Sequence, residues 1–211
     1  MKTVVVTGGT TRLGLEISKY LRNLGWCVIT TSHRVNSGAD IIADLSKSDG
    51  AIKLYLSVIK RLGGNPPDAL VNNASLFSGD SQSIKNVNFE SPKKLISLMG
   101  SRDTPDRGFV VNIIDATSCI EGSSDYAKSK RELLEFTKDA SKMFLNTINV
   151  NAVAPGPVLP PQGFSLKADN CPIGRPTPQA VAEAVSYFLS ATFVTGQLIS
   201  VDGAYNIEKS L

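Results

Sequence analysis

Two side chains that could move a proton lie four residues apart in the segment YAKSK, residues 126–130. A helix is predicted over residues 124–145, and residues four apart share one face of a helix, so Tyr126 and Lys130 would lie together. A tyrosine phenol ordinarily has a pKa of about 10, and a neighbouring ammonium lowers that value because it stabilises the phenolate. Such a pair can protonate a substrate that receives hydride. Taken alone, the spacing is common by chance, and an exposed helical pair is then the favoured interpretation.

A second candidate site is the glycine-rich segment TGGTTRLG at residues 7–14, which follows an apolar run at residues 3–6. Glycines let backbone amides approach a pyrophosphate, and the N-terminus of the helix that follows favours negative charge. Arg12 stands where such loops usually have their middle glycine, so a cation would face the same anion. The position between a strand and an amphipathic helix supports a nucleotide site. An ordinary glycine turn is the alternative.

The residues after the second predicted strand bear on the choice of dinucleotide. NAD-binding sheets often carry an acidic residue there for the ribose hydroxyls, whereas this chain has Ser32-His33-Arg34. A carboxylate would repel a 2′-phosphate, but Arg34 can bind one through charge-assisted hydrogen bonds. Together with Arg12, this residue favours NADPH over NADH. The alternative is that Arg34 lies on a solvated surface.

The elements that must position these residues alternate along the whole chain. Strands are predicted at residues 3–7, 26–30, 41–42, 68–72, 109–114, 147–153 and 198–201, and helices at 12–24, 52–62, 87–99, 124–145 and 178–190. This alternation predicts an α/β fold, a single-domain Rossmann doubly wound parallel sheet over residues 1–211, with about seven strands and helices on both faces. Ligands bind beyond the carboxyl ends of the strands in such sheets, where both candidate segments fall. Residues 155–178 are predicted to form a loop at the same edge.

Composition indicates a globular protein and argues against several other functions. Hydrophobic residues make up 42% of the chain, charged residues 19%, and the net charge is +3, which fits a chain with a full core. The charge is too weak and too scattered for a nucleic-acid partner. No stretch approaches the roughly 18 apolar residues of a membrane span, and no secretory leader pattern opens the chain. The three separated cysteines form no metal or disulfide pattern, so a cytoplasmic protein without a metal site is expected.

The motifs together resemble the short-chain dehydrogenase/reductase family over nearly the whole chain. The matching segments are TGGTTRLG at 7–14, DL at 44–45, NNAS at 72–75, VNF at 87–89, YAKSK at 126–130, NVNAVAPGPV at 149–158 and TGQLISVDGA at 195–204. Within this family the chain is most similar to pteridine and dihydromonapterin reductases. That branch has an arginine in the glycine loop, His-Arg after the second strand, NNAS followed by an aromatic residue, and aspartate in place of the catalytic serine. The corresponding residues here are Arg12, His33, Arg34, Phe77 and Asp115.

The resemblance implies a role for each matched residue. The catalytic residues would be Asp115, Tyr126, Lys130 and Asn88, of which Asn88 resembles the family's asparagine that holds a water in the proton relay. The residues that bind NADPH or NADP would be Gly8, Thr10, Arg12, Leu13, Gly14, His33, Arg34, Asp44, Leu45, Asn73, Ala74, Ser75, Tyr126, Lys130, Pro155, Gly156 and Val158. The small-molecule substrate, a pterin, would be bound by Arg12, Ser75, Phe77, Asp115 and Tyr126. Phe77 would stack on the flat heterocycle, with core packing as the alternative.

The implied reaction is hydride transfer from NADPH to a C=N bond of a dihydropterin or dihydrofolate-type substrate, with protonation of the ring nitrogen. Two departures from the family pattern bear on it. Asp115 precedes Tyr126 by 11 residues, fewer than the pattern has, so Thr117 or Ser118 is an alternative hydroxyl donor. The segment 155–178 is short, which predicts a small or open lid.

Two other functions stay open at this point. One is reduction of a carbonyl substrate such as an oxoacyl thioester or a sugar, and the other is NADP sensing without catalysis, against which Tyr126 and Lys130 count. The family resemblance also implies a homo-oligomer, a tetramer or a dimer, built on the helices at residues 87–99 and 124–145.

Overall fold

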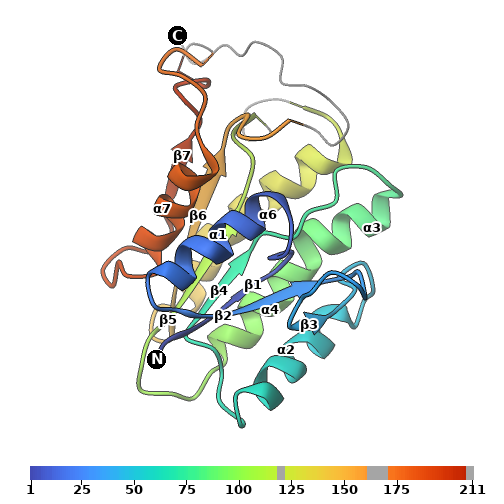
Figure 1. Ribbon diagram of the computed structural model, residues 1–211, viewed down its shortest axis with the longest axis vertical. Helices are drawn as coiled ribbons and strands as arrows, with labels where there is room; N and C mark the ends of the chain where they lie inside the picture. The colour runs from blue at the N-terminus through green and yellow to red at the C-terminus, as the bar shows by residue number, and fades with distance from the viewer. Residues whose placement is uncertain (118–121, 161–170, 208–211) are drawn as a thin grey trace.

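The apolar runs of the sequence form the strands of one parallel sheet (Figure 1). The structure is a computed structural model that describes residues 1–117, 122–160 and 171–207. The strands are β1 (Thr3–Val6), β2 (Cys27–Ser32), β3 (Ile41–Ile42), β4 (Ala69–Asn72), β5 (Gly108–Ile113), β6 (Ile148–Pro155) and β7 (Leu198–Val201). Their order in the seven-stranded sheet is β3-β2-β1-β4-β5-β6-β7, and every pairing is parallel. The predicted doubly wound Rossmann sheet is therefore confirmed.

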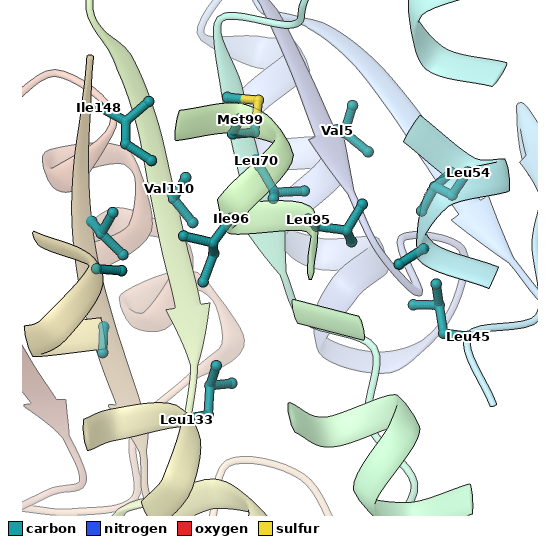
Figure 2. Packing of buried hydrophobic residues seen from close by; sticks show 14 of the residues in the cluster. Val5, Leu45, Leu54, Leu70, Leu95, Ile96, Met99, Val110, Leu133 and Ile148 are labelled. Atoms are coloured by element: carbon teal, nitrogen blue, oxygen red, sulfur yellow. The ribbon is translucent and has the colours of Figure 1, made fainter. Parts of the chain in front are cut away.

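Helices cover both faces of this sheet (Figure 1). They are α1 (Arg12–Asn23), α2 (Gly50–Arg61), α3 (Ser81–Lys85), the π-helix η1 (Asn86–Glu90), α4 (Ser91–Gly100), α6 (Asp125–Met143) and α7 (Pro178–Phe188). Alternate residues of β1 enter two separate cores, because successive side chains of a strand point to opposite faces. Val5 packs with the cluster under α2, α4 and α6, whereas Val4 and Val6 pack with the cluster under α1 and α7. Figure 2 shows the first of these clusters, with Leu95 and Ile96 of α4 over the sheet residues Leu70 and Val110.

The helix predicted over residues 87–99 is present but begins earlier than the sequence pattern indicates. Asp80 caps α3 by accepting a hydrogen bond from the Ser83 backbone N–H, and the chain then runs through η1 into α4. In η1 the Ser91 N–H bonds the Asn86 carbonyl, five residues back. Pro92 has no N–H to offer to the preceding turn, and this loss of a donor explains why the wider turn forms just before it. Such π-turns often occur at functional sites, and this one contains Asn88.

The sheet order places two loops of interest side by side. β1 lies between β2 and β4 and pairs with both in parallel, so the loops that follow β1, β2 and β4 leave the sheet at the same edge. The direction of strand addition reverses at β1, since β2 and β3 extend the sheet on one side and β4 to β7 on the other. Ligands of doubly wound sheets bind at this switch point. The glycine-rich segment and the NNAS segment both lie there.

Candidate active site at the carboxyl edge of the sheet

The glycine loop after β1 is tied to the loop after β4. The Thr7 hydroxyl accepts hydrogen bonds from the backbone N–H groups of Asn73, at 2.9 Å, and Ala74, at 3.0 Å. In return, the Asn73 side-chain amide donates to the carbonyls of Thr7, at 2.9 Å, and Gly8, at 3.3 Å. Asn73 was predicted to bind the cofactor, and here its amide nitrogen holds the loop that would do so. Thr7 was not among the predicted site residues, although its place at the strand end is a signal for such a tie.

Two glycines of the loop, Gly8 and Gly14, resist replacement by a residue with a side chain. Gly8 has a φ of +64°, a conformation that glycine adopts without strain. A Cβ on Gly14 would run into the Gly8 carbonyl and lie 2.5 Å from the Asn73 amide nitrogen. Thr11 precedes α1 and makes no side-chain cap of the helix, and the first turn carries no acidic residue. The N–H groups of that turn therefore suit an anion, and the residues present fit a dinucleotide pyrophosphate.

Arg12 has a left-handed backbone conformation, which explains why most such loops have glycine at this position. Its φ is +51°, in the left-handed region, which costs a non-glycine residue about 1–2 kcal/mol. Its guanidinium is exposed and donates to the Pro160 carbonyl at 2.6 Å. The arginine thus joins the glycine loop to the segment after β6, a contact between residues 148 apart in the chain. Strain of this kind is found at functional sites.

The predicted adenosine end of the site lies beyond β2. His33 and Arg34 are both exposed, and the Arg34 N–H donates to the Ser32 hydroxyl at 3.1 Å. The Asp44 carboxylate accepts from the Ser46 hydroxyl and N–H, and these two bonds hold the pKa of Asp44 below its ordinary value. Leu45 is buried, and its carbonyl accepts from the Ser91 hydroxyl at 2.9 Å. The side chain of Leu45 is part of the core, so a ligand contact would fall to its backbone.

The proton-transfer pair predicted from YAKSK begins helix α6. Ser124 caps the helix by accepting from the Ala127 N–H at 3.2 Å, which places Tyr126 in the first turn. The Tyr126 hydroxyl donates to the Asp115 carboxylate at 3.2 Å. The Lys130 ammonium is buried, donates to the Ile113 carbonyl at 2.9 Å, and lies 5.7 Å from the centre of the Tyr126 ring. The structure therefore brings Asp115, Tyr126 and Lys130 together despite the short spacing between the first two.

Asn88 acts as a buried connector between two loops of the site. Its side chain is 0% exposed. Its carboxamide oxygen accepts from the Ser75 hydroxyl at 3.2 Å and the Leu76 N–H at 2.8 Å, and its amide nitrogen donates to the Leu76 carbonyl at 3.0 Å. The same nitrogen donates to the Ser129 hydroxyl at 3.1 Å, and that hydroxyl donates to the Tyr126 carbonyl at 2.7 Å. Asn88 thereby links the NNAS loop to the helix that carries Tyr126.

Phe77 is the exposed aromatic residue of the site. Its side chain is 77% exposed, so the alternative that it packs in the core is wrong. The centres of the Phe77 and Tyr126 rings lie 5.0 Å apart, with 57° between the ring planes. An exposed aromatic ring therefore lies beside the ring of Tyr126, whose hydroxyl would supply a proton. Ser75, two residues before Phe77, is exposed at the same loop.

The remaining predicted residues frame this edge of the sheet. Thr10 and Leu13 are half-buried, and Leu13 packs against the core under α1. Pro155 ends β6, and the Gly156 N–H donates to the Val201 carbonyl at 2.9 Å. A Cβ on Gly156 would lie 2.7 Å from the Asp202 Cα, and Val158 is buried. Thr117 is exposed, whereas Ser118 and residues 161–170 of the predicted lid lie outside the described residues.

The described part of the chain contains neither a metal-binding cluster nor a membrane-spanning helix. Among residues 1–117, 122–160 and 171–207, no group of three or more His, Cys, Asp and Glu residues could hold a metal ion. No helix within the described ranges combines the length and the apolar character that a membrane crossing needs.

A glycine-rich loop at the switch point of a parallel sheet, next to a Tyr-Lys pair, defines a dinucleotide-binding oxidoreductase. A family model described as Enoyl-(Acyl carrier protein) reductase matches residues 32–206. The chain belongs to the short-chain dehydrogenase/reductase family and is an NAD(P)-dependent oxidoreductase. This result confirms the family and the enzyme class that the sequence motifs predict.

Several relatives are similar to the chain over its length. Carbonyl reductase family member 4 of Xenopus tropicalis is 27% identical, covering 98% of this chain and 99% of the relative. The 3-oxoacyl-[acyl-carrier-protein] reductase FabG of Chlamydia pneumoniae is 27% identical, covering 96% of each chain. The crystal structure of FolM Alternative dihydrofolate reductase 1 from Brucella suis, in complex with NADP, is 30% identical, with a TM-score of 0.84 and coverage of 98% of this chain and 95% of that one.

Proposed function

We propose that this reductase uses NADPH to reduce a dihydropterin or dihydrofolate-type substrate. The observation that carries the proposal is the exposed Phe77 ring, 5.0 Å from the ring of Tyr126. A flat heterocycle can lie against an exposed aromatic face, and here that face adjoins a proton donor. The name of the FolM neighbour, an alternative dihydrofolate reductase in complex with NADP, supports the same substrate class.

The site residues supply what such a reduction needs besides hydride. When bound, the nicotinamide cofactor supplies the hydride, which adds to the carbon of a C=N bond. The Tyr126 hydroxyl donates the proton that the ring nitrogen gains, and the buried Lys130 ammonium stabilises the phenolate left behind. Asp115 orients the hydroxyl through the bond of 3.2 Å. Arg12 and Ser75 would bind the polar edge of the substrate from the two loops beside it.

The proposed preference for NADPH rests on charge. Arg34 and His33 are exposed directly after β2, where a carboxylate would otherwise bind ribose hydroxyls. An arginine there can form bidentate, charge-assisted hydrogen bonds to a 2′-phosphate. The Arg12 guanidinium has five donors, so its bond to the Pro160 carbonyl leaves others for a cofactor or substrate anion.

Substrate panels with the purified protein test this function. NADPH oxidation is measured with dihydrobiopterin, dihydromonapterin and dihydrofolate, and with a set of ketones and oxoacyl thioesters. The proposal expects turnover with the pterins and inhibition by methotrexate-type antifolates. Turnover of ketones without turnover of pterins would overturn it in favour of a carbonyl reductase, the activity that the names of two relatives favour. NADPH binding without any turnover would indicate a sensor.

A pair of phenylalanine variants sharpens the substrate assignment. Phe77→Ala removes the ring beside Tyr126, and we expect the KM for a pterin to rise about tenfold, the value of one aromatic contact. Phe193→Ala is the matched control, because Phe193 is also exposed, at 101%, but lies in the turn after α7. Equal KM values for both variants would contradict the stacking role.

We also propose that residues 1–211 act as one domain and assemble as a homo-oligomer, a dimer or a tetramer. The helices expected to carry the interface, α4 and α6, pack against each other on one face of the sheet. Light scattering during size-exclusion chromatography tests this assembly, and a monomer at assay concentrations would refute it.

A further inference from the structure

The loop that carries His33 and Arg34 is closed by a carboxylate clamp. One Asp40 carboxylate oxygen accepts from the Thr30 N–H at 2.9 Å and from the Thr30 hydroxyl at 2.8 Å. In return the Asp40 N–H donates to the Thr30 hydroxyl at 3.3 Å. Thr30 is 3% exposed and lies inside β2, so the clamp fixes the far end of the loop to a buried strand.

The connection between β2 and β3 needs such a clamp because it is short. β3 pairs with β2 in parallel, Thr31 with Ile41 and Ser32 with Ile42. Parallel neighbours are usually joined by crossovers of about a dozen residues or more, but here only residues 33–40 lie between the two strands. β3 has two residues, so the ladder itself offers little to hold the loop in place.

Hydrogen bonds inside the loop connect the clamp to Arg34. The Ala39 N–H donates to the Ser37 hydroxyl at 3.4 Å, and the Ser37 N–H donates to the Arg34 carbonyl at 3.3 Å. The Arg34 N–H in turn donates to the Ser32 hydroxyl at 3.1 Å. The backbone of Arg34 is thus fixed from both ends of the loop.

Two arginines from neighbouring helices flank the Asp40 carboxylate. The Arg61 guanidinium of α2 lies 3.0 Å from Asp40, and the Arg22 guanidinium of α1 lies 4.0 Å away. Burial opposes ionisation of Asp40, but the bonds from Thr30 and these two cations outweigh it, so its pKa is lowered from the ordinary value. A carboxylate that accepts two bonds from Thr30 is therefore present at neutral pH.

From these contacts we propose that Asp40 is a positioning residue for coenzyme selection, which holds the His33-Arg34 loop where it can bind the 2′-phosphate. This inference rests on the proposed use of NADPH, because Asp40 would act through Arg34. Without the clamp, Arg34 and its loop must become ordered when NADPH binds. The free-energy cost of that ordering lowers the affinity. NADH lacks the phosphate, so its binding would not carry that loss.

The protein contains a matched control for the clamp. Asp68 accepts from the Thr3 N–H at 2.6 Å and the Thr3 hydroxyl at 2.9 Å, and its own N–H donates to that hydroxyl at 3.1 Å. Thr3 begins β1, and Asp68 directly precedes β4. This second clamp therefore lies at the amino edge of the sheet, opposite the cofactor loops. Asp68→Asn should reproduce the structural effect of Asp40→Asn without touching the loop after β2.

The experiment compares coenzyme affinities of the full-length variants. The dissociation constants of NADPH and NADH are measured by fluorescence titration for the wild type, Asp40→Asn, Asp68→Asn and Arg34→Gln. The inference expects Asp40→Asn to lower the preference for NADPH by about threefold or more, because a neutral amide oxygen accepts weaker bonds from Thr30 than the carboxylate does. Asp68→Asn should keep the wild-type preference. Should Asp40→Asn fail to fold, Thr30→Val and Thr3→Val replace the pair, since each removes the hydroxyl of one clamp.

The direction of the change separates positioning from simple electrostatics. Asp40→Asn removes a negative charge near an anion site, so Coulomb attraction alone would strengthen NADPH binding and raise the preference. A preference that rises, or that changes equally in Asp40→Asn and Asp68→Asn, would overturn the inference. If the wild type shows no preference for NADPH and Arg34→Gln changes nothing, the proposed coenzyme falls and the inference with it.

Discussion

Replacement of Asn88 by alanine tests whether one buried side chain holds the catalytic helix against the NNAS loop. The substitution removes four hydrogen bonds, with Ser75, with the N–H and carbonyl of Leu76, and with Ser129. Each bond contributes about 1 kcal/mol net, and a buried partner left unpaired costs about as much again. The Ser129 hydroxyl is buried, whereas Ser75 is exposed and can bind water. We therefore expect Asn88→Ala to lower the free energy of unfolding by about 4 kcal/mol.

Urea unfolding and thermal melts measure this loss. A loss of about 4 kcal/mol corresponds to a fall in Tm of roughly 10 °C for a chain of this size. Asn86→Ala is the control, because Asn86 lies in the same π-turn but bonds the Ser46 carbonyl and the Gln82 amide, away from Tyr126. It should cost no more than about 2 kcal/mol. A loss below about 1 kcal/mol for Asn88→Ala would refute the idea that this network holds the site together.

Further substitutions test the other parts of the site. Gly14→Ala should lower Tm and weaken NADPH binding, measured by thermal shift with and without NADPH, because its Cβ would lie 2.5 Å from the Asn73 amide nitrogen. Arg12→Gly should keep the free energy of unfolding in urea within about 1 kcal/mol of the wild type, because relief of the φ of +51° is offset by loss of the bond to Pro160 and by the freedom of glycine in the unfolded chain. It should nevertheless raise the Kd of NADPH; unchanged affinity would contradict its role. Phe77→Ala should change the free energy of unfolding by less than about 0.5 kcal/mol, since the ring is 77% exposed. The pKa of Asp40 is lowered in the folded state, so its carboxylate contributes stability above the unfolded-state pKa, and this stability is lost as pH falls through the folded-state pKa. Asp40→Asn should therefore reduce the fall in the free energy of unfolding, measured in urea, between about pH 5 and 2.

Much of the fold could be predicted because its signals are local. Apolar runs such as residues 109–113 predict buried strands, and the spacing of Leu13, Ile17 and Leu21 predicts the buried face of α1. The extra turn at α3 was missed because Asp80 caps only five helical residues of mixed polarity. The start of the helix at residue 87 was misplaced for a related reason, since Pro92 usually marks a helix beginning and here follows a π-turn.

The candidate site also combines residues that the sequence indicated with residues that it did not. Residue type alone indicated Tyr126 and Lys130, because a phenol and an ammonium four apart on a helix share one face. Residue type alone did not indicate that Asn88 connects two loops, or that Thr7 and Ser129 take part in holding the site together. These three side chains bond partners that are distant in the sequence; Asn88 and Ser129, for example, are 41 positions apart.

The sequence by itself determined the alternation of strands and helices, the glycines of the loop and the chemical groups at the carboxyl edge, since these depend on neighbouring residues. Only the tertiary structure decided that Arg12 contacts Pro160, that Phe77 is exposed beside Tyr126, and that Asp40 clamps the loop after β2. The physical reason is that parallel strands bring distant loops to one edge of the sheet. Which side chains meet there depends on strand order and on the competition between burial and hydrogen bonding.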